Sequence, residues 1–219
     1  PRARAADSGG EPLLDVVGVT AGYRGRDVLT NLSLGIPRGH AMAWLGRNGA
    51  GKSTLAKTII GLVRQHAGSI RVAGTLLDPL PVEQRARHVG LVFQDPSRQL
   101  FGRTVLDEAA FGPRALGMRG ADARASARAS LAIVGLESAA DWHPGDLAPQ
   151  SQRLLAIAAA MAGHPALLIL DEPTAGQDAA GRRAIARALD AQRTRGAAAV
   201  ITHDLAFAET ECDGSVIIG

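Results

Sequence analysis

A glycine-rich segment that begins at Gly46, with the sequence GRNGAGKS, constrains this chain more than any other feature. It fits the pattern G-x-x-x-x-G-K-[ST], in which backbone N–H groups converge on the phosphates of a nucleotide. Gly46, Gly49 and Gly51 allow backbone conformations that are closed to residues with a side chain. Lys52 can reach the β- and γ-phosphates, and the Ser53 hydroxyl can ligate Mg²⁺. The segment therefore predicts a nucleotide-binding loop.

The residues on either side of this loop fit the same prediction. Ala41–Leu45 is a short apolar run typical of a buried strand, and residues 54–60 have the pattern of a helix. A helix that begins at the loop points its positive end toward the phosphates. The pattern alone occurs in several nucleotide-binding families and can also arise by chance. We expect the nucleotide to contact Gly46, Arg47, Asn48, Gly49, Ala50, Gly51, Lys52, Ser53 and Thr54.

Composition narrows the class of protein. The chain has 219 residues, 46% hydrophobic and 21% charged, which is ordinary for a globular domain. A formal charge of +3 is too small to indicate nucleic-acid binding, so we expect no nucleic-acid partner. Cys212 is the single cysteine, which excludes an internal disulfide and is compatible with a reducing compartment. The longest apolar run, residues 154–162, is too short to span a bilayer, and we expect no signal peptide, because the N-terminal residues lack an apolar core segment.

The two ends of the sequence have the character of cut ends. The chain begins at Pro1 rather than Met and stops at Gly219, directly after the strand-like run 216–218. We expect a piece of a longer or tandem polypeptide, in which residues 1–11, rich in Arg, Ala, Gly and Ser, form a flexible linker. A trimmed single-domain protein is the alternative.

Hydrophobic patterning predicts an α/β fold. Between residues 104 and 162 the pattern is helical, and a further helix is expected over 179–195. A parallel sheet with helices, interrupted by a helical insertion, is the simplest arrangement. The segments with a strand pattern are 13–19, 28–36, 41–45, 68–74, 89–93, 166–170 and 197–201.

Two adjacent carboxylates, Asp171 and Glu172, follow an apolar strand-like run. In phosphate-loop ATPases an Asp at this position supports Mg²⁺. The following Glu is placed to polarise the attacking water. A strand that simply ends in solvated acids is the alternative for a lone Asp-Glu pair, but here the pair follows a phosphate loop and precedes the run Pro173–Gly176.

In this context the chain resembles the nucleotide-binding subunit of ATP-binding-cassette (ABC) transporters over essentially its whole length. The resemblance implies that Tyr23 stacks on adenine and that His203 contacts the γ-phosphate. It implies that Gln94 touches Mg²⁺ and senses the membrane partner. Asp171 and Glu172 match the metal-supporting acid and the hydrolytic base. Taken singly, Tyr23 could be a turn aromatic, Gln94 a surface amide and His203 a strand-end histidine.

The same resemblance implies the architecture and the cofactors. It implies a phosphate-loop (RecA-like) mixed sheet core with an antiparallel β region and an inserted α-helical subdomain. The ATPase domain would cover residues 12–219, with the nucleotide-binding core at 12–94 and 164–219 and the helical subdomain at 95–163. ATP would bind with Mg²⁺, and Ser53, Gln94 and Asp171 would hold the metal. Residues 175–178 occupy the loop that crosses to the other nucleotide-binding half.

A finer resemblance lies between residues 92 and 113. The segment Q-x-P-x-x-Q-L-F that starts at Gln94 is similar to that of energy-coupling-factor and cobalt-type importers. Those importers pair two ATPases with a transmembrane coupling subunit and a small substrate-capturing membrane protein. The resemblance implies a motor for uptake of a vitamin or metal ion, bound peripherally at the cytoplasmic face of the cell membrane. We expect Gln94, Leu100 and Phe101 to lie where the coupling subunit docks.

The chain departs from the family at its signature, L-S-G-G-Q. Leu147 is kept, but Ala148, Pro149, Gln150 and Ser151 stand where the family has Ser, Gly, Gly and Gln. Ala148 has no hydroxyl and Pro149 has no N–H to offer a phosphate, although Pro is favoured in the first turn of a helix. The helix should therefore form while much of the anion-binding chemistry is lost. A sequencing error or another alignment is the alternative.

In this family the signature acts on ATP held by the other half. The resemblance therefore implies a partner ATPase domain with an intact signature, in a heterodimer or a tandem fusion, rather than a homodimer. The other hypotheses are a soluble ABC-type ATPase not linked to transport, acting in translation or DNA maintenance, and a regulatory half with weak hydrolysis. Glu172 and His203 argue against the regulatory half, and the absence of long charged helical inserts argues against the soluble type.

Overall fold

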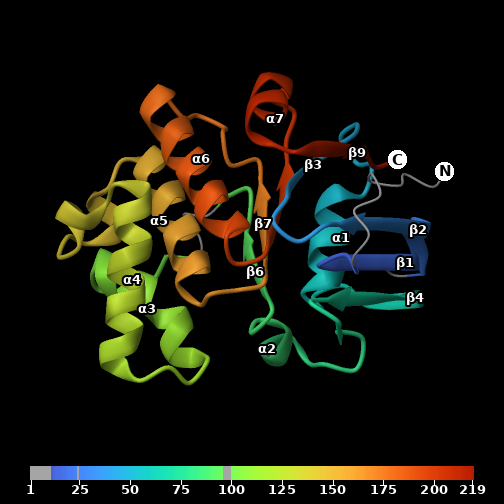
Figure 1. Ribbon diagram of the computed structural model, residues 1–219, viewed down its shortest axis with the longest axis horizontal. Coiled ribbons are helices and arrows are strands. Elements are labelled where there is room, and N and C mark those ends of the chain that lie inside the picture. Colours follow the sequence, from blue (N-terminus) through green and yellow to red (C-terminus); the bar gives the residue numbers. More distant parts are fainter. Residues whose placement is uncertain (1–10, 24, 96–99) are drawn as a thin grey trace.

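The computed structural model describes residues 11–23, 25–95 and 100–219. Most of the expected linker, residues 1–10, lies outside the described residues, as do positions 96–99 of the segment that starts at Gln94. The described chain forms an α/β fold with two sheets (Figure 1). This confirms the expected fold class.

One sheet is parallel in every pairing among the described residues. Its central strands are apolar and buried, because helices or the second sheet cover both faces there. Its strand order is β6 (Val89–Val92), β7 (Leu167–Asp171), β8 (Ala197–Ile201), β3 (Ala41–Leu45) and β9 (Gly214–Ile217).

The expected antiparallel region is a separate sheet. Its order is β2 (Arg26–Ile36), β1 (Leu14–Tyr23), β4 (Gln65–Val72) and β5 (Thr75–Leu76). β1 is longer than its apolar pattern indicates, and its register with β2 shifts after Val16, Val19 and Ala21.

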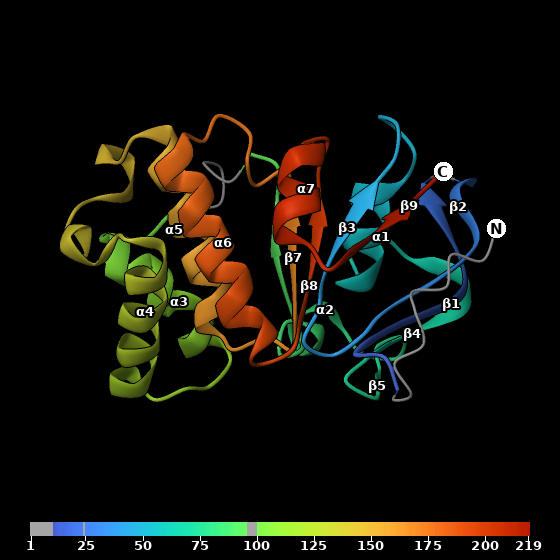
Figure 2. The same ribbon diagram turned by 45° about the horizontal axis from the view of Figure 1, so that its top comes forward.

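The two faces of the parallel sheet belong to two hydrophobic cores. Side chains alternate along a strand, so Leu168 and Leu170 of β7 enter one core while Leu167 and Ile169 enter the other. Figure 2 shows α5 and α6 side by side along the first face. The first core lies against α3 (Val105–Ala115), α4 (Gly120–Val134), α5 (Pro149–Ala162) and α6 (Ala179–Arg193), and the second against α1 (Lys52–Ile59) and the antiparallel sheet.

The remaining helical elements are short. They are α2 (Val82–Arg85), α7 (Leu205–Glu211) and two 3₁₀ turns at Glu137–Ala139 and Pro144–Asp146. None of the helices in the described part of the chain is long and apolar enough to cross a membrane.

Candidate functional site

The phosphate-loop segment joins the carboxyl end of β3 to the start of α1. Gly46, Gly49 and Gly51 have φ values of 142°, 81° and 99°. These values favour glycine, since a side chain would strain the backbone there. At Gly46 there is also no room, because an ideal Cβ would lie 2.2 Å from the carbonyl oxygen of Ile218. The conformation therefore favours glycine at all three positions, and at Gly46 it also leaves no space for a side chain.

Lys52 is the first residue of α1, and its side chain is only 7% exposed. Its ammonium group donates to the carbonyl oxygens of Gly46 (2.6 Å) and Arg47 (3.0 Å). A buried ammonium needs such partners. This places a positive charge beside the backbone N–H groups at the start of α1, so the loop and the helix end together form an anion site.

Ser53 and Asp171 meet on the other side of the loop. The Ser53 hydroxyl donates to Asp171 Oδ2 at 2.8 Å, and Asp171 is 7% exposed at the end of β7. A hydroxyl and a carboxylate oxygen are ligands that suit Mg²⁺. Among the described residues no group of three or more His, Cys, Asp or Glu side chains could hold a metal ion. The hydroxyl and carboxylate of this pair fit Mg²⁺ that arrives with phosphate oxygens, as Mg²⁺ commonly binds.

Glu172 follows directly and has a left-handed backbone, with φ of 50°. Such a value is uncommon for a residue with a side chain and occurs where the surroundings enforce it. Its backbone N–H donates to Ile201 O at 2.8 Å. Its carboxylate faces His203, with Oε1 3.4 Å from Nε2 and Oε2 3.4 Å from the backbone nitrogen. Glu172, directly after β7, is thereby directed toward His203, which lies two residues after β8.

A pocket of about 490 Å³ lies where these segments converge. It lies at the carboxyl edge of a parallel sheet, where α/β proteins commonly bind ligands. A neighbouring pocket that shares Gly49 is lined by Tyr23, and another is lined by Gly46 and Arg47. The structure therefore brings together every residue that the sequence predicts for the site. The main pocket is lined by Asn48, Gly49, Ala50, Gly51, Lys52, Ser53, Thr54, Gln94, Asp171, Glu172, Ala175, Ile201 and His203.

Arg153, in the first turns of α5, also contacts the site, although no sequence pattern predicts it. One guanidinium nitrogen, Nη1, donates to the carbonyl oxygens of Gln94 (2.9 Å) and Glu172 (3.1 Å). Both acceptors are backbone groups distant in sequence from Arg153, so no local sequence pattern could predict these bonds.

A second missed contact supports the segment that carries His203. Asp204 caps α7 by accepting from the Phe207 N–H at 3.1 Å, and it forms an ion pair with Arg182 at 2.6 Å. Partial burial alone would raise the pKa of the Asp204 carboxyl. The hydrogen bonds from Phe207, Arg182 and Thr174 and the charge of Arg182 outweigh burial and hold that pKa below its ordinary value. The carboxylate therefore stays ionised and keeps α7 joined to α6.

The signature-like segment opens α5. Ala148 takes the N-cap position without a hydroxyl to offer, and Pro149 is the first helical residue, as its missing N–H and fixed φ favour. The carbonyl of Gln150 accepts from the Gln177 amide at 3.0 Å. The helix thus forms as expected, and its start is tied to the loop at 175–178.

An aromatic pair lies on the surface at the start of the helical region. Phe101 is 65% exposed and meets Phe111 edge to face, with ring centroids 4.6 Å apart. The buried Glu108 carboxylate accepts from the backbone N–H groups of Phe101 (2.8 Å) and Gly102 (2.6 Å). Leu100 instead packs against the first core. Of the expected apolar pair, Phe101 is the exposed member.

Comparison with known proteins gives the family. Residues 29–175 match the ABC transporter family. A putative ABC transporter ATP-binding protein of Streptomyces coelicolor is 37% identical over 94% of this chain and 78% of its own length. The cobalt import ATP-binding protein CbiO of Rhodobacter capsulatus is 38% identical over 92% of this chain and 74% of its own length.

A solved structure supports the same relationship. CbiO1 from Clostridium perfringens, described as part of the ABC transporter complex cbiONQ, superimposes with a TM-score of 0.84. It is 30% identical and covers 95% of this chain, which spans 85% of it. The chain thus belongs to the ABC transporter family, as an ATP-binding and ATP-hydrolysing motor domain of a transporter.

Proposed function

We propose that this domain powers an importer of the energy-coupling-factor type, which takes up a vitamin or a metal ion. The observation that carries the proposal is the convergence of the phosphate loop, Gln94, Asp171, Glu172 and His203 on one pocket. The importer type is supported by the similarity to a cobalt import protein and to a chain from the cbiONQ complex. The Q-x-P-x-x-Q-L-F segment supports it independently.

Within the site, we assign to each residue the role that the family resemblance implies. The loop from Gly46 to Thr54 holds the phosphates, and Tyr23 offers its ring to adenine from the pocket that shares Gly49. Ser53, Gln94 and Asp171, which line the pocket, would hold Mg²⁺, and the ion would offset negative charge on the phosphates. Glu172 orients the attacking water, and His203, which faces it, contacts the γ-phosphate.

A second ATPase domain completes the assembly. In a family where the signature serves the partner's nucleotide, Ala148 and Pro149 weaken the partner's site and leave this chain's own site dependent on an intact signature in trans. The partner is therefore a different domain, in a heterodimer or fused in tandem. The loss of anion-binding groups at α5 also favours the second candidate, a regulatory half with weak hydrolysis.

The membrane partners are a transmembrane coupling subunit and a substrate-capturing membrane protein, with this chain peripheral at the cytoplasmic face. We assign the nucleotide-binding core to 12–94 and 164–219 and the helical subdomain to 95–163, within a longer or tandem polypeptide. Phe101, which is exposed and follows Gln94 by seven residues in the sequence, is the docking contact that we assign to the coupling subunit.

ATP turnover by the purified chain, measured at increasing protein concentration, tests whether the domain needs a different partner domain with an intact signature. We expect Mg·ATP binding with slow hydrolysis at every concentration, because no competent signature is present in trans. Turnover should rise when the partner ATPase is added. Robust hydrolysis by a pure homodimer would contradict the proposal.

The Glu172→Gln substitution separates the motor from the regulatory half. It should abolish this site's share of turnover in the full complex and leave nucleotide binding intact, since it removes the charge that orients water and keeps the size of the side chain. Unchanged turnover would favour the regulatory half. A parallel fall in nucleotide affinity would make Glu172 a structural or metal-binding residue.

A further inference from the structure

Arg153 connects three parts of the molecule that are far apart in sequence. It lies in the first turns of α5, directly after the signature-like segment. Its Nη1 group donates to the carbonyl oxygen of Gln94, after β6, and to that of Glu172, after β7. Nη1 carries two N–H groups, so one nitrogen satisfies both carbonyls. The helix start, the Gln94 loop and Glu172 are therefore joined at one charged group.

The contact at Glu172 falls where the backbone most needs support. With φ at 50°, Glu172 is held in a region that side-chain-bearing residues rarely adopt. Its peptide groups are fixed on both sides, since its N–H donates to Ile201 and its C=O accepts from Arg153 (3.1 Å) and, at a longer 3.3 Å, from the backbone N–H of Ala175. This conformation directs the carboxylate toward His203. Without Arg153 the carbonyl would lose a charge-assisted bond, and the backbone could relax away from it.

We propose that Arg153 is a positioning residue, which holds the backbones of Glu172 and Gln94 in the arrangement needed for hydrolysis and makes that arrangement depend on the position of α5. The inference rests on the proposed role of Glu172 as the base. α5 packs with α3, α4 and α6 in the first core and rests on β6 and β7, and Glu172 follows β7 directly. A shift of α5 relative to the sheet would break one or both bonds of Arg153. The position of the helical region would thereby determine whether Glu172 is held in the conformation needed for hydrolysis.

The side chain is suited to this role rather than to filling the core. Arg153 is partly exposed, and its two bonds go to carbonyl oxygens rather than to a carboxylate. Because a single nitrogen donates both bonds, the ammonium group of a lysine could make both. An alanine could make neither. This difference gives the test a conservative variant.

The experiment compares ATP turnover and nucleotide affinity in the assembled transporter, using the full polypeptide that carries this chain. The variants are Arg153→Ala, Arg153→Lys and Glu172→Gln. Arg187→Ala is the matched control, since Arg187 also donates to a distant backbone carbonyl, that of Ile133, but does not line the main pocket. The turnover lost in Glu172→Gln defines the activity that runs through this site.

For the part of the turnover that runs through this site, Arg153→Ala should lower kcat between about 10- and 100-fold, because small misplacements of catalytic groups have effects of this size. ATP affinity should stay as in Arg187→Ala, and Arg153→Lys should restore most of the rate. In the Glu172→Gln background Arg153→Ala should cause no further loss, since both act on one step. Such a split between rate and affinity is not the result of a general structural defect.

Two results would overturn the inference. One is turnover in Arg153→Ala equal to that of Arg187→Ala; the other is a loss of ATP affinity as large as the loss of rate. If Glu172→Gln itself leaves turnover unchanged, the proposed function fails at its base assignment, which is a different outcome. A loss in Glu172→Gln without one in Arg153→Ala refutes the role of Arg153 alone.

Discussion

Gly46 and Gly49 show at the scale of single residues why the phosphate loop needs glycine. Both have positive φ, but only Gly46 is enclosed by backbone, with Ile218 O 2.2 Å from an ideal Cβ. Gly49→Ala meets open space and should cost about 1–2 kcal/mol of stability through its backbone conformation alone. Gly46→Ala should cost clearly more, because β9 or the loop must also move. Urea unfolding of both variants measures the difference.

Nucleotide binding by the same two proteins provides the control. Gly49→Ala should remain folded at ambient temperature, so any loss of ATP affinity there reflects the loop itself. Equal unfolding midpoints for the two variants would contradict the crowding at Gly46.

The sequence predicts the residues of the site far better than the contacts that hold them. The glycine spacing, Lys52 and the Asp-Glu pair are local patterns, and the structure brings their members to the main pocket or, for Gly46, to the pocket beside it. Arg153 could not be predicted, since its value comes from two backbone carbonyls supplied by other segments. The catalytic and metal-binding roles of the pocket residues remain predictions.

At the scale of single elements, the stability of α7 depends on the ionisation of its N-cap residue, Asp204. The pKa of Asp204 is held below its ordinary value, so the stability that its carboxylate contributes is complete above about pH 4 and is lost as the pH falls through the lowered value. Arg182→Ala should raise this pKa and remove about 0.5–1 kcal/mol at neutral pH, because the pair is partly exposed. The difference between wild type and variant should vanish in strong acid. Carboxyl ¹³C NMR of Asp204 measures the pKa, and an unchanged value in Arg182→Ala would contradict the assignment.

The start of α5 offers a second test at this scale. Replacing Ala148, Pro149, Gln150 and Ser151 by Ser, Gly, Gly and Gln supplies a hydroxyl, a backbone N–H and room for close approach. Each charge-assisted hydrogen bond regained contributes about 1.5–3 kcal/mol to holding a phosphate. Loss of Pro149 loosens the helix start and offsets part of this gain. The bond from Gln177 is made to a backbone carbonyl and survives the change.

The measurement is ATP occlusion at the partner's phosphate loop, with the partner's own signature disabled. The repaired chain should trap more ATP than the original. If it traps no more, the altered signature is not what silences that site, and the partner's phosphate loop becomes the place to look.

Elements differ in how far their sequence predicts them. β3 and β8 match their apolar runs, because burial on both faces leaves a continuous signal. The long helices α4, α5 and α6 fall within the helical patterns for a similar reason. α2, α7 and β5 were missed, since elements this short carry little periodicity and owe their form to caps and neighbours. The shifted register of β1 also lacks a signal in the sequence.

For the molecule as a whole, Phe101 tests how the chain meets the membrane complex. Its ring is exposed on Phe111, while its backbone is held by Glu108 and does not need the side chain. Phe101→Asp should release the protein from membranes that carry the coupling subunit without lowering ATP affinity. Val17→Asp is the control, because Val17 is another exposed apolar residue, on β1. Sedimentation with membranes measures the effect, and retention of Phe101→Asp would count against this docking surface.

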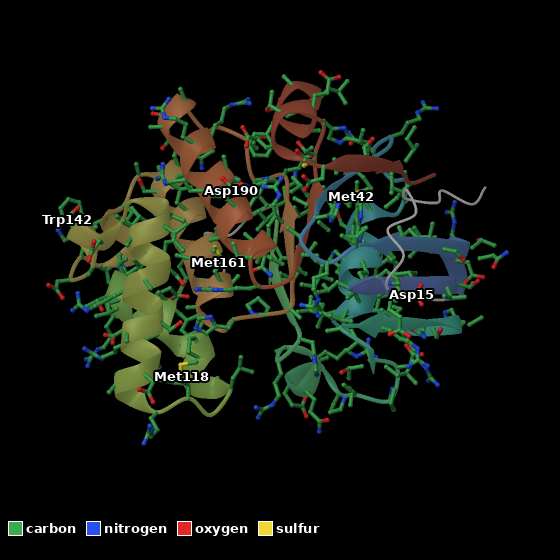
Figure 3. All side chains as sticks on the ribbon, viewed as in Figure 1. Asp15, Met42, Met118, Trp142, Met161 and Asp190 are labelled. Carbon is green, nitrogen blue, oxygen red and sulfur yellow. The ribbon has the colours of Figure 1, made fainter. Side chains whose placement is uncertain are left out.

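The chain has two tryptophans, and they lie in opposite parts of the molecule. Trp44 is fully buried in β3, in the core beneath the phosphate loop. Trp142 is 57% exposed and lies at the outer edge of the helical region (Figure 3). Their fluorescence should therefore separate into a blue-shifted component shielded from acrylamide and a red-shifted component open to it. With one tryptophan replaced by phenylalanine at a time, the fluorescence of the other reports on a single region. Conformational changes beneath the phosphate loop can then be followed separately from changes at the outer edge of the helical region.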